Sequence, residues 1–572
     1  MTLSPAARDA ALVRLGSGEE LDVLVLGGGV VGCGAALDAV TRGLSTGLVE
    51  ARDWASGTSS RSSKLIHGGL RYLEMLDFGL VHEALQERRL LLTTIAPHLV
   101  RPVPFMYPLT RPAWERFYVG SGVALYDGLA FGVGAGSGLP RHRHLGKKAA
   151  LRLMPSLRPD ALTGAIQYHD AQVDDARFVL ELARTAADHG AHVVNRVAAT
   201  GLLRGPAGEV TGIRAHDEVT GADLQVRARR VVGAVGVWTD ELQAMLGEDA
   251  PAGADAVRVR ASKGVHLVVP RDRIDSETGV ILRTATSVLF VISWEDHWIV
   301  GTTDTDWAFD RAHPAASSPD IDYLLDTVNA VLVRPLTRDD VDGVYAGLRP
   351  LVSGGEDDPT TKVSREHTVA SPAPGLVLVA GGKYTTYRVM AKDVVDEAVR
   401  DLGREVPPST TESIPLVGAL GWEEVAERPH VIARSAGLPV EAVEMLLERY
   451  GTLTVQLVAL VNARPELAEP LPGGEGHLKV EVVYAAACEA ALHLTDVLTR
   501  RTRISIEARD RGLEAAPHAA ALLAPVLGWD DADVAREIEV YRRRVDAEMS
   551  ANTMPDDASA DRARREAPDA AL

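Results

Sequence analysis

The stretch from Leu21 to Glu50 constrains the fold of this chain more than any other. Leu21–Leu26 (LDVLVL) is a short apolar run with the length and β-branched content of a buried strand. It leads into Gly27-Gly28-Gly29-Val30-Val31-Gly32, a G-x-G-x-x-G sequence, and then into small and apolar residues at helical spacing. A second run, Gly47–Val49, ends on the acid Glu50. Strand, glycine turn, helix, strand and acid, in this order, are typical of a dinucleotide-binding βαβ unit.

Each part of this unit has a physical role. The glycines at positions 27, 29 and 32 let the backbone approach a pyrophosphate at a helix N-terminus, where amide groups and the helix dipole favour negative charge. Glu50 is expected to accept hydrogen bonds from ribose hydroxyls. The alternative is a tight strand–helix turn that binds nothing, but the complete context favours nucleotide binding.

Length and charge narrow the class of protein. A chain of 572 residues predicts two or three domains. The net charge of −19 argues against nucleic acid as the main partner. Cys33 and Cys488 allow at most one disulfide, and Cys33 lies inside the nucleotide turn, so we expect a reducing, cytosolic environment. Residues 1–20 are polar and alanine-rich and show no signal pattern.

Tyr118–Leu139 is the most membrane-like segment, with Asp127 as its only charge. It contains seven glycines, each of which weakens a helix by about 1 kcal/mol relative to alanine. We therefore expect a buried helix to about Phe131, followed by a glycine loop. Shallow insertion into a membrane surface is the alternative.

The domain boundaries are predicted from changes of pattern. Val231–Gly236 has the pattern of a buried strand beside the first one, and Leu376–Arg388 repeats the strand–glycine–helix order. Prolines near residue 407 then interrupt the pattern, and the chain beyond them has helical periodicity. We expect an N-terminal extension (1–20), interleaved cofactor- and substrate-binding domains (21–405), a helical cap (406–550) and a disordered tail (551–572). Within the cap, the basic cluster Arg500–Arg503 is interpreted as a solvated helix end.

Residues 51–75 form a second informative stretch. They are rich in hydroxyls and glycine, and Lys64, His67, Arg71 and Tyr72 stand among them. Ordinary loops do not combine so many hydrogen-bond donors with so little acid.

Residues 58–74 of this stretch, TSSRSSKLIHGGLRYLE, resemble the FAD-dependent glycerol-3-phosphate dehydrogenases of the aerobic, bacterial type. The resemblance extends over about residues 20–545. It includes, in order, Gly27–Gly32, Val173–Arg177, Lys263–Pro270, Gly301–Asp304, Gly347–Pro350, Gly381–Arg388 and Leu492–Arg503. It implies an α/β fold: an FAD-binding Rossmann-like domain of the amino-acid-oxidase type, an antiparallel-sheet substrate domain and an all-helical C-terminal domain.

The resemblance also implies a reaction, the oxidation of sn-glycerol 3-phosphate to dihydroxyacetone phosphate. A hydride passes from C2 to N5 of FAD while the C2 hydroxyl loses its proton. No second G-x-G-x-x-G indicates a nicotinamide site, and the family implies a quinone acceptor with peripheral contact at the inner face of the cell membrane. A homodimer and the absence of a metal site are further expectations.

Three alternatives remain open at this point. An oxidase of the same substrate would pass electrons to oxygen and release peroxide. An oxidase of another amine or hydroxy acid would not need paired phosphate-binding arginines. A flavin-binding structural or sensor protein would lack turnover altogether.

The site residues are carried over from the matching motifs. Phosphate capture requires arginine forks and hydroxyl donors, which Arg71, Tyr72 and Arg349 supply. His266 is the expected base and substrate contact, because imidazole accepts a proton near neutral pH. Lys383 is expected to place positive charge beside the flavin. The expected cofactor-binding residues are Gly27, Gly29, Gly32, Glu50, Ser59, Ser63, Lys64, His67, Gly382, Lys383 and Thr385.

One position departs from the family pattern. Val235 stands where such flavoproteins carry threonine, so one hydroxyl is missing. Losing a single neutral hydrogen bond costs about 1 kcal/mol. This lowers the expected affinity for the cofactor without changing the assignment.

Overall fold

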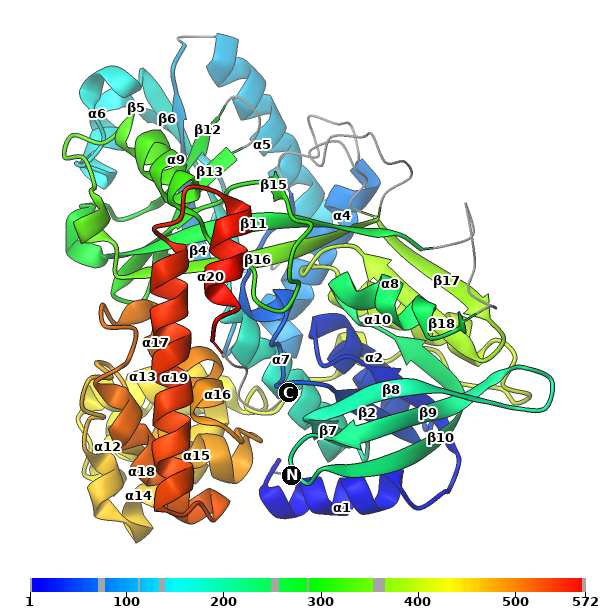
Figure 1. The fold of residues 1–572 in the computed structure, drawn as a ribbon. Helices are drawn as coiled ribbons and strands as arrows, with labels where there is room; N and C mark the ends of the chain where they lie inside the picture. Colours follow the sequence, from blue (N-terminus) through cyan, green and yellow to red (C-terminus); the bar gives the residue numbers. More distant parts are fainter. Residues whose placement is uncertain are drawn as a thin grey trace.

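The computed structural model describes residues 3–69, 78–111, 114–132, 139–247, 257–284, 288–352 and 366–567. Two sheets and a helical cap make up the protein (Figure 1). In the view of Figure 1 the substrate-domain sheet lies at the top, the nucleotide-binding sheet at the lower right and the cap at the lower left.

The nucleotide-binding sheet has eight strands with a parallel centre in the order β18-β10-β1-β2-β7. Leu24 of β1 pairs with Val231 of β10, which confirms the predicted neighbour of the first strand. The parallel strands are β1 (Leu21–Leu26), β2 (Thr46–Glu50), β7 (His192–Asn195), β10 (Ala222–Gly233) and β18 (Leu376–Gly381). Antiparallel additions are β8 (Val197–Arg204), β9 (Val210–Asp217) and β17 (His367–Ala373).

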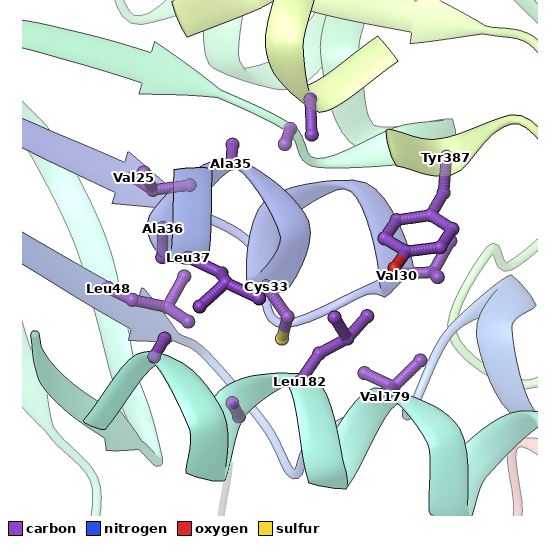
Figure 2. Packing of buried hydrophobic residues seen from close by; sticks show 14 of the residues in the cluster. Val25, Val30, Cys33, Ala35, Ala36, Leu37, Leu48, Val179, Leu182 and Tyr387 are labelled. Atoms are coloured by element: carbon purple, nitrogen blue, oxygen red, sulfur yellow. The ribbon is translucent and has the colours of Figure 1, made fainter. Parts of the chain in front are cut away.

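Helix α2 (Val30–Thr41) packs between this sheet and helix α7 (Asp175–Asp188), as Figure 2 shows. Cys33 points toward Leu182 of α7, and Tyr387, the first residue of helix α10 (Tyr387–Val399), lies beside Val30 at the N-terminal end of α2. A Cβ atom on Gly34 would lie 2.9 Å from the Tyr387 ring. The run of small residues after the glycine turn is thus what allows α2 to lie this close to its neighbours. Helices α1 (Pro5–Leu15) and α8 (Thr239–Ala244) belong to the same domain, whereas α4 (Phe78–Leu90) packs Val81 and Leu85 into the cluster of the substrate-domain sheet.

The substrate domain is built on a ten-stranded, mainly antiparallel sheet, as the resemblance implied. Its longest ladder joins β11 and β16, which pair from Val259↔Val352 to Val268↔Gly343. The strands are β3 (Leu65–Ile66), β4 (Arg101–Leu109), β5 (Arg143–Gly146), β6 (Gly164–Gln172), β11 (Val259–Pro270), β12 (Gly279–Arg283), β13 (Val288–Trp294), β14 (His297–Gly301), β15 (Thr305–Asp306) and β16 (Gly343–Val352). Helices α5 (Trp114–Gly132), α6 (Lys147–Leu153) and α9 (Ser318–Asn329) belong to the same domain.

Helix α5 corrects the interpretation of the membrane-like segment. The helix ends at Gly132, close to the predicted Phe131. Val123 and Tyr126 are buried, but Phe117, Tyr118 and Leu125 are 70%, 45% and 43% exposed. The expectation of a buried helix therefore holds for one face only. In the described residues no helix is both long enough and apolar enough to span a bilayer.

The cap is helical, as predicted, and comes after the proline-rich stretch that follows α10. Its longest helix, α19, runs from the cap up to the sheet of the substrate domain (Figure 1). The cap helices are α11 (Trp422–Ala426), α12 (Pro429–Ala436), α13 (Val440–Tyr450), α14 (Thr454–Ala463), α15 (Lys479–Cys488), α16 (Leu494–Asp496), α17 (Ile504–Glu507), α18 (Ala515–Leu527) and α19 (Asp531–Ala551).

The basic cluster of the cap is buried, so its interpretation as a solvated helix end is wrong. Arg500 Nε and Arg501 Nη1 both donate to Asp53 Oδ2, at 2.5 and 2.8 Å. Arg503 pairs with Asp174 and Asp175 at the start of α7. These arginines lie at the contact between the cap and the nucleotide-binding domain, where carboxylates replace the water that a surface cluster would bind.

The predicted disordered tail is also wrong over the described residues to Ala567. Helix α20 (Asp557–Arg564) forms after a short turn and packs back against the protein (Figure 1). Ala560 and Ala563 are buried in an apolar cluster, and Asp557 pairs with the buried Lys263. The polar side chains of this segment include partners of ion pairs that hold it in place. Composition alone does not distinguish such a segment from a solvated tail.

Candidate active site

A cavity of about 560 Å³ opens at the carboxyl ends of the parallel strands and extends to β11 and β16. This is the edge of an α/β sheet at which ligands bind. Glycine turns line one part of it and titratable side chains line another. Of the predicted site residues, those that line the cavity are Gly27, Gly29, Glu50, Ser59, Ser63, His67, His266, Arg349, Gly382 and Lys383.

The turn between β1 and α2 has the geometry of a phosphate cradle. Gly29 is the N-cap of α2, and a Cβ atom on it would meet only Ser59 Oγ, at 3.3 Å. A Cβ atom on Gly27 would lie 2.6 Å from the Ala234 carbonyl oxygen, and one on Gly32 would lie 1.9 Å from the Gly27 carbonyl oxygen. Gly32 does not line the cavity, so it serves packing, whereas Gly29 leaves room for a ligand at the helix N-terminus.

Glu50 stands at the end of β2, on the cavity wall. Its Oε2 accepts from the Gly28 amide at 2.5 Å, and its Oε1 accepts from the Arg52 amide at 2.7 Å. Burial raises the pKa of this carboxyl, while the two amide hydrogen bonds oppose the rise. A carboxylate has lone pairs beyond these two bonds, so the predicted ribose contact is compatible with its position. Cavity size, open helix N-terminus and acid together fit the dinucleotide part of FAD.

His266 lies on β11, where strands of the substrate domain line the cavity. Its Nε2 is 2.8 Å from Ser63 Oγ, and its ring stacks on Tyr345 of β16 with centroids 4.7 Å apart. Burial, and then the charges of Arg349 and Lys64, hold the pKa of this imidazole well below its usual 6.5. His266 is therefore neutral near pH 7, as a proton acceptor must be.

Arg349 stands on β16 and is held by the turn that comes after β14. Its Nη1 donates to the Thr303 carbonyl at 3.3 Å, and its Nη2 donates to Thr302 Oγ1 at 3.2 Å. Asp304 Oδ1 lies 3.4 Å from Nη1 and completes the support. Since this side chain is 28% exposed and lines the cavity, its guanidinium faces a region that an anion can enter.

Lys383 lies in the turn between β18 and α10. Gly381 and Gly382 precede it with φ values of +78° and +75°, a conformation that glycine adopts without strain. All three residues line the cavity. The repeated strand–glycine–helix order thus brings a lysine to the same opening as the nucleotide turn.

Two further residues predicted to contact the cofactor, Lys64 and Thr385, are not among those that line the cavity. Lys64 is fully buried, and its Nζ donates to Asp175 Oδ1 at 2.7 Å. Thr385 Oγ1 accepts from the His67 amide and lies 3.3 Å from the His67 carbonyl oxygen. Arg71 and Tyr72, the other predicted phosphate contacts, lie outside the described residues.

Asp175 and Tyr345 are site residues that sequence reasoning missed. Asp175 Oδ2 accepts from the Ser62 amide and hydroxyl at 2.9 and 2.7 Å, next to the serine that meets His266. The motif Val173–Arg177 contains two acids, and the first, Asp174, is explained by its place at the helix start, where its side chain caps α7. The second, apparently redundant acid is the signal in the sequence that could have indicated Asp175.

Comparison with known proteins identifies relatives over the whole chain. Residues 22–396 match the family of FAD-dependent oxidoreductases, and residues 409–534 match the C-terminal domain of alpha-glycerophosphate oxidase. Glycerol-3-phosphate dehydrogenase 2 of Mycobacterium tuberculosis is 54% identical over 568 residues, covering 99% of this chain and 95% of the relative. The mitochondrial glycerol-3-phosphate dehydrogenase of Homo sapiens is 37% identical, covering 95% of this chain and 76% of its own.

The fold also matches a solved structure. The X-ray structure of the glycerol-3-phosphate dehydrogenase of Bacillus halodurans complexed with FAD aligns with a TM-score of 0.76 and 28% identity. The alignment covers 95% of this chain and 97% of that one. Both sheets and most of the cap lie within the two matched families, whereas α20 lies beyond residue 534, where the second match ends.

Proposed function

We infer that this chain, which belongs to the FAD-dependent oxidoreductases and within them to the glycerol-3-phosphate dehydrogenases, uses FAD to oxidise sn-glycerol 3-phosphate to dihydroxyacetone phosphate. The observation that carries this inference is the meeting of three features in one cavity: the glycine turn at α2, a neutral His266 and Arg349. A flavin-binding protein without turnover would not need the second and third features.

Three tasks fall to the side chains of this cavity. When bound, FAD supplies the acceptor for the hydride that leaves C2 of the substrate. His266 takes the proton of the C2 hydroxyl. Its Nε2 is the nitrogen on the cavity side, since Ser63 lines the cavity and lies 2.8 Å from that atom. Arg349 grips the phosphate with two parallel N–H groups, and Lys383 supplies positive charge at the cofactor end.

Anaerobic reduction of the purified flavoprotein tests this function. Addition of glycerol 3-phosphate should bleach the oxidised flavin absorbance, and dihydroxyacetone phosphate should appear in equal amount. Glycerol, which lacks the phosphate, should bleach it far more slowly. If glycerol 3-phosphate leaves the flavin oxidised while another hydroxy acid or an amine reduces it, the substrate assignment is wrong.

We further propose a quinone as the electron acceptor. The support is the family resemblance together with the absence of a second glycine fingerprint in the sequence. The reduced protein should be reoxidised by a soluble quinone analogue faster than by air. Rapid reoxidation in air with one peroxide per turnover, and no response to quinone, would instead identify an oxidase.

Contact with a membrane surface is proposed at α5 and the segment beside it. Three exposed apolar side chains of α5 lie next to a basic stretch, because the Arg116 side chain donates to the Leu145 carbonyl at 2.9 Å. The exposed cations of that stretch are Arg141, Arg143, Lys147, Lys148 and Arg152. Figure 1 shows α5, β5 and α6 at the same end of the molecule, away from the cap. Apolar side chains with basic neighbours suit an anionic lipid surface, in a chain whose net charge is −19.

A homodimer stays a prediction. Size-exclusion chromatography with light scattering decides it, since a dimer has twice the 61.0 kDa mass of the chain.

A further inference from the structure

Helix α20 supports the outer side of the cavity wall. Ala560 and Ala563 pack in one apolar cluster with Val237 and Leu348. These last two residues also line the cavity. Helix α20 and this part of the cavity wall thus belong to one apolar cluster.

The same helix reaches β11 through a buried lysine. Lys263 is fully buried, and its Nζ donates to Asp557 Oδ1 of α20 at 2.5 Å and to Asp320 Oδ2 of α9 at 2.6 Å. Ser317 Oγ donates to Asp557 Oδ1 as well, at 2.8 Å. Lys263 precedes His266 by three residues on the same strand and pairs with Leu348 across the ladder. Asp557 is therefore connected to the base through one side chain and one short piece of strand.

Three further contacts fix the position of α20. The Asp310 amide donates to Asp561 Oδ1 at 3.1 Å, and the Ser318 amide donates to the Met554 carbonyl at 2.9 Å. Arg564 Nη2 lies 3.3 Å from the Nδ1 of His313. The loop between β15 and α9 is thus held along its length, so α20 is anchored on the substrate domain and not only on the cap that precedes it.

We propose that Asp557 is a positioning residue for the oxidation: it holds Lys263, and through β11 it holds His266 where the substrate hydroxyl must meet it. The proposal rests on the function proposed above, in which His266 is the base. Among the described residues, the nearest hydrogen bonds of Arg349 are with the turn after β14, at 3.2 and 3.3 Å, so the phosphate grip should depend less on α20 than His266 does. The effect should therefore fall on the rate of flavin reduction at saturating substrate and not on KM.

Two variants of the full chain, purified with FAD, test the proposal. Asp557→Ala removes both hydrogen bonds to the carboxylate, and Asp557→Asn keeps the shape but removes the charge in case the first variant is unstable. Each should bind FAD fully, keep KM within about twofold and reduce flavin roughly 10-fold more slowly, since small displacements of a reacting group are costly. Arg562→Ala is the matched control, because it removes an exposed charge from the same helix. It should behave like the wild type.

Variants in two further backgrounds separate positioning from general support of the wall. In a His266→Ala protein, Asp557→Ala should cause no additional slowing, because its effect passes through the missing base. In a Lys263→Met protein, Asp557→Ala should not lower the rate of flavin reduction further, because both changes remove the same ion pair. Additive losses in either background would overturn the proposal, and so would a wild-type rate in both Asp557 variants. Failure of the wild type itself to reduce its flavin with glycerol 3-phosphate would instead refute the proposed function.

Discussion

The surroundings of His266, the proposed base, come from two segments of the chain, the loop that leads into β3 and strand β16. Ser63, from the loop after β2, meets its Nε2, and Tyr345 of β16 stacks on its ring. Arg349 and Lys64 add positive charge nearby, which lowers the pKa of the imidazole beyond the effect of burial. A neutral base surrounded by cations suits a dianionic substrate, whose own charge offsets theirs when it binds.

Replacing Arg349 and replacing His266 should therefore change different kinetic parameters. Arg349→Lys loses the two-pronged grip, so KM for glycerol 3-phosphate should rise strongly while the limiting rate of flavin reduction changes little. His266→Ala removes the proton acceptor, so the limiting rate should fall by about 10²–10⁴ with less effect on KM. Anaerobic stopped-flow reduction over a range of substrate concentrations measures both quantities. Equal losses of affinity, with neither limiting rate lowered, would make His266 a binding residue.

The turn between β1 and α2 is an element in which glycines have two different duties. Gly27 and Gly32 are required by the protein's own backbone, because a side chain at either position would collide with it. Gly29 is not, since the space beside it opens into the cavity. The G-x-G-x-x-G motif does not distinguish these roles, and only the packing around each glycine shows which role it has.

Gly29→Val should consequently produce a folded protein that has lost its cofactor. A Cβ atom at this position meets only the end of the Ser59 side chain, and the valine side chain would occupy the space at the helix N-terminus that a pyrophosphate needs. Flavin absorbance per protein and the melting temperature with and without added FAD report the two effects. Gly122→Val, at a position with no heavy atom within 4 Å, is the control and should retain FAD. Normal FAD occupancy in Gly29→Val would mean that the cofactor does not approach this turn.

The proposed contact of helix α5 with a membrane surface can be tested with lipid vesicles. The protein should sediment with vesicles that contain anionic lipid, and less so as salt is raised, because ions screen the basic stretch. Phe117→Ser combined with Leu125→Ser should weaken this binding at least about 10-fold, since both side chains are exposed on α5. Leu420→Ser is the control, because Leu420 is 80% exposed but belongs to the cap. Equal loss in the control would point to a different membrane-binding face.

Elements with local signals are predictable from the sequence, and those that depend on distant partners are not. The glycine turns and the strand that carries His266 are encoded by neighbouring residues, and the structure contains them. Arg500 resembles a surface charge in the sequence because its partner, Asp53, lies 447 positions away. Lys64 is expected at the cofactor for the same reason, since nothing near it in sequence indicates Asp175. In the same way, the packing of α20 against the protein depends on Lys263 and on an apolar cluster that lie far away in the sequence.

At the scale of the whole molecule, the cap and the nucleotide-binding domain are joined by charges buried on both sides. The contact also contains His98, whose ring lies 6.3 Å from that of Trp422 in the cap and is 1% exposed. Desolvation lowers the pKa of His98 to about 3, with a smaller contribution from the charge of Arg177. The folded protein thus keeps this imidazole neutral at pH values where the unfolded chain protonates it.

Acidification should weaken the protein through His98. The unfolded chain takes up the proton near pH 6.5 and the folded one only near pH 3. The stability due to the neutral ring is therefore complete above pH 6.5 and is lost as the pH falls below it. Relative to His98→Gln, the wild type should lose about 1.4 kcal/mol of unfolding free energy per pH unit in that range. Urea titrations from pH 7 to 5 measure this, with the exposed His430→Gln as control. Parallel pH profiles for wild type and His98→Gln would contradict the assignment.

The ion pairs that close the contact with the cap have a consequence for the order in which the protein is made. Asp175 supports Ser62 and Lys64 beneath the cavity, and its partner Arg503 lies 328 residues further along the chain. A ribosome that adds about 10 residues per second needs on the order of half a minute to cover that distance. Throughout this interval Asp174 and Asp175 lack the guanidinium of Arg503, although Lys64 is already present beside Asp175. The residues beneath the cavity, Ser62, Lys64 and Asp175, are therefore synthesised early but gain their last partner late. This part of the site reaches its final structure only after most of the polypeptide has been made.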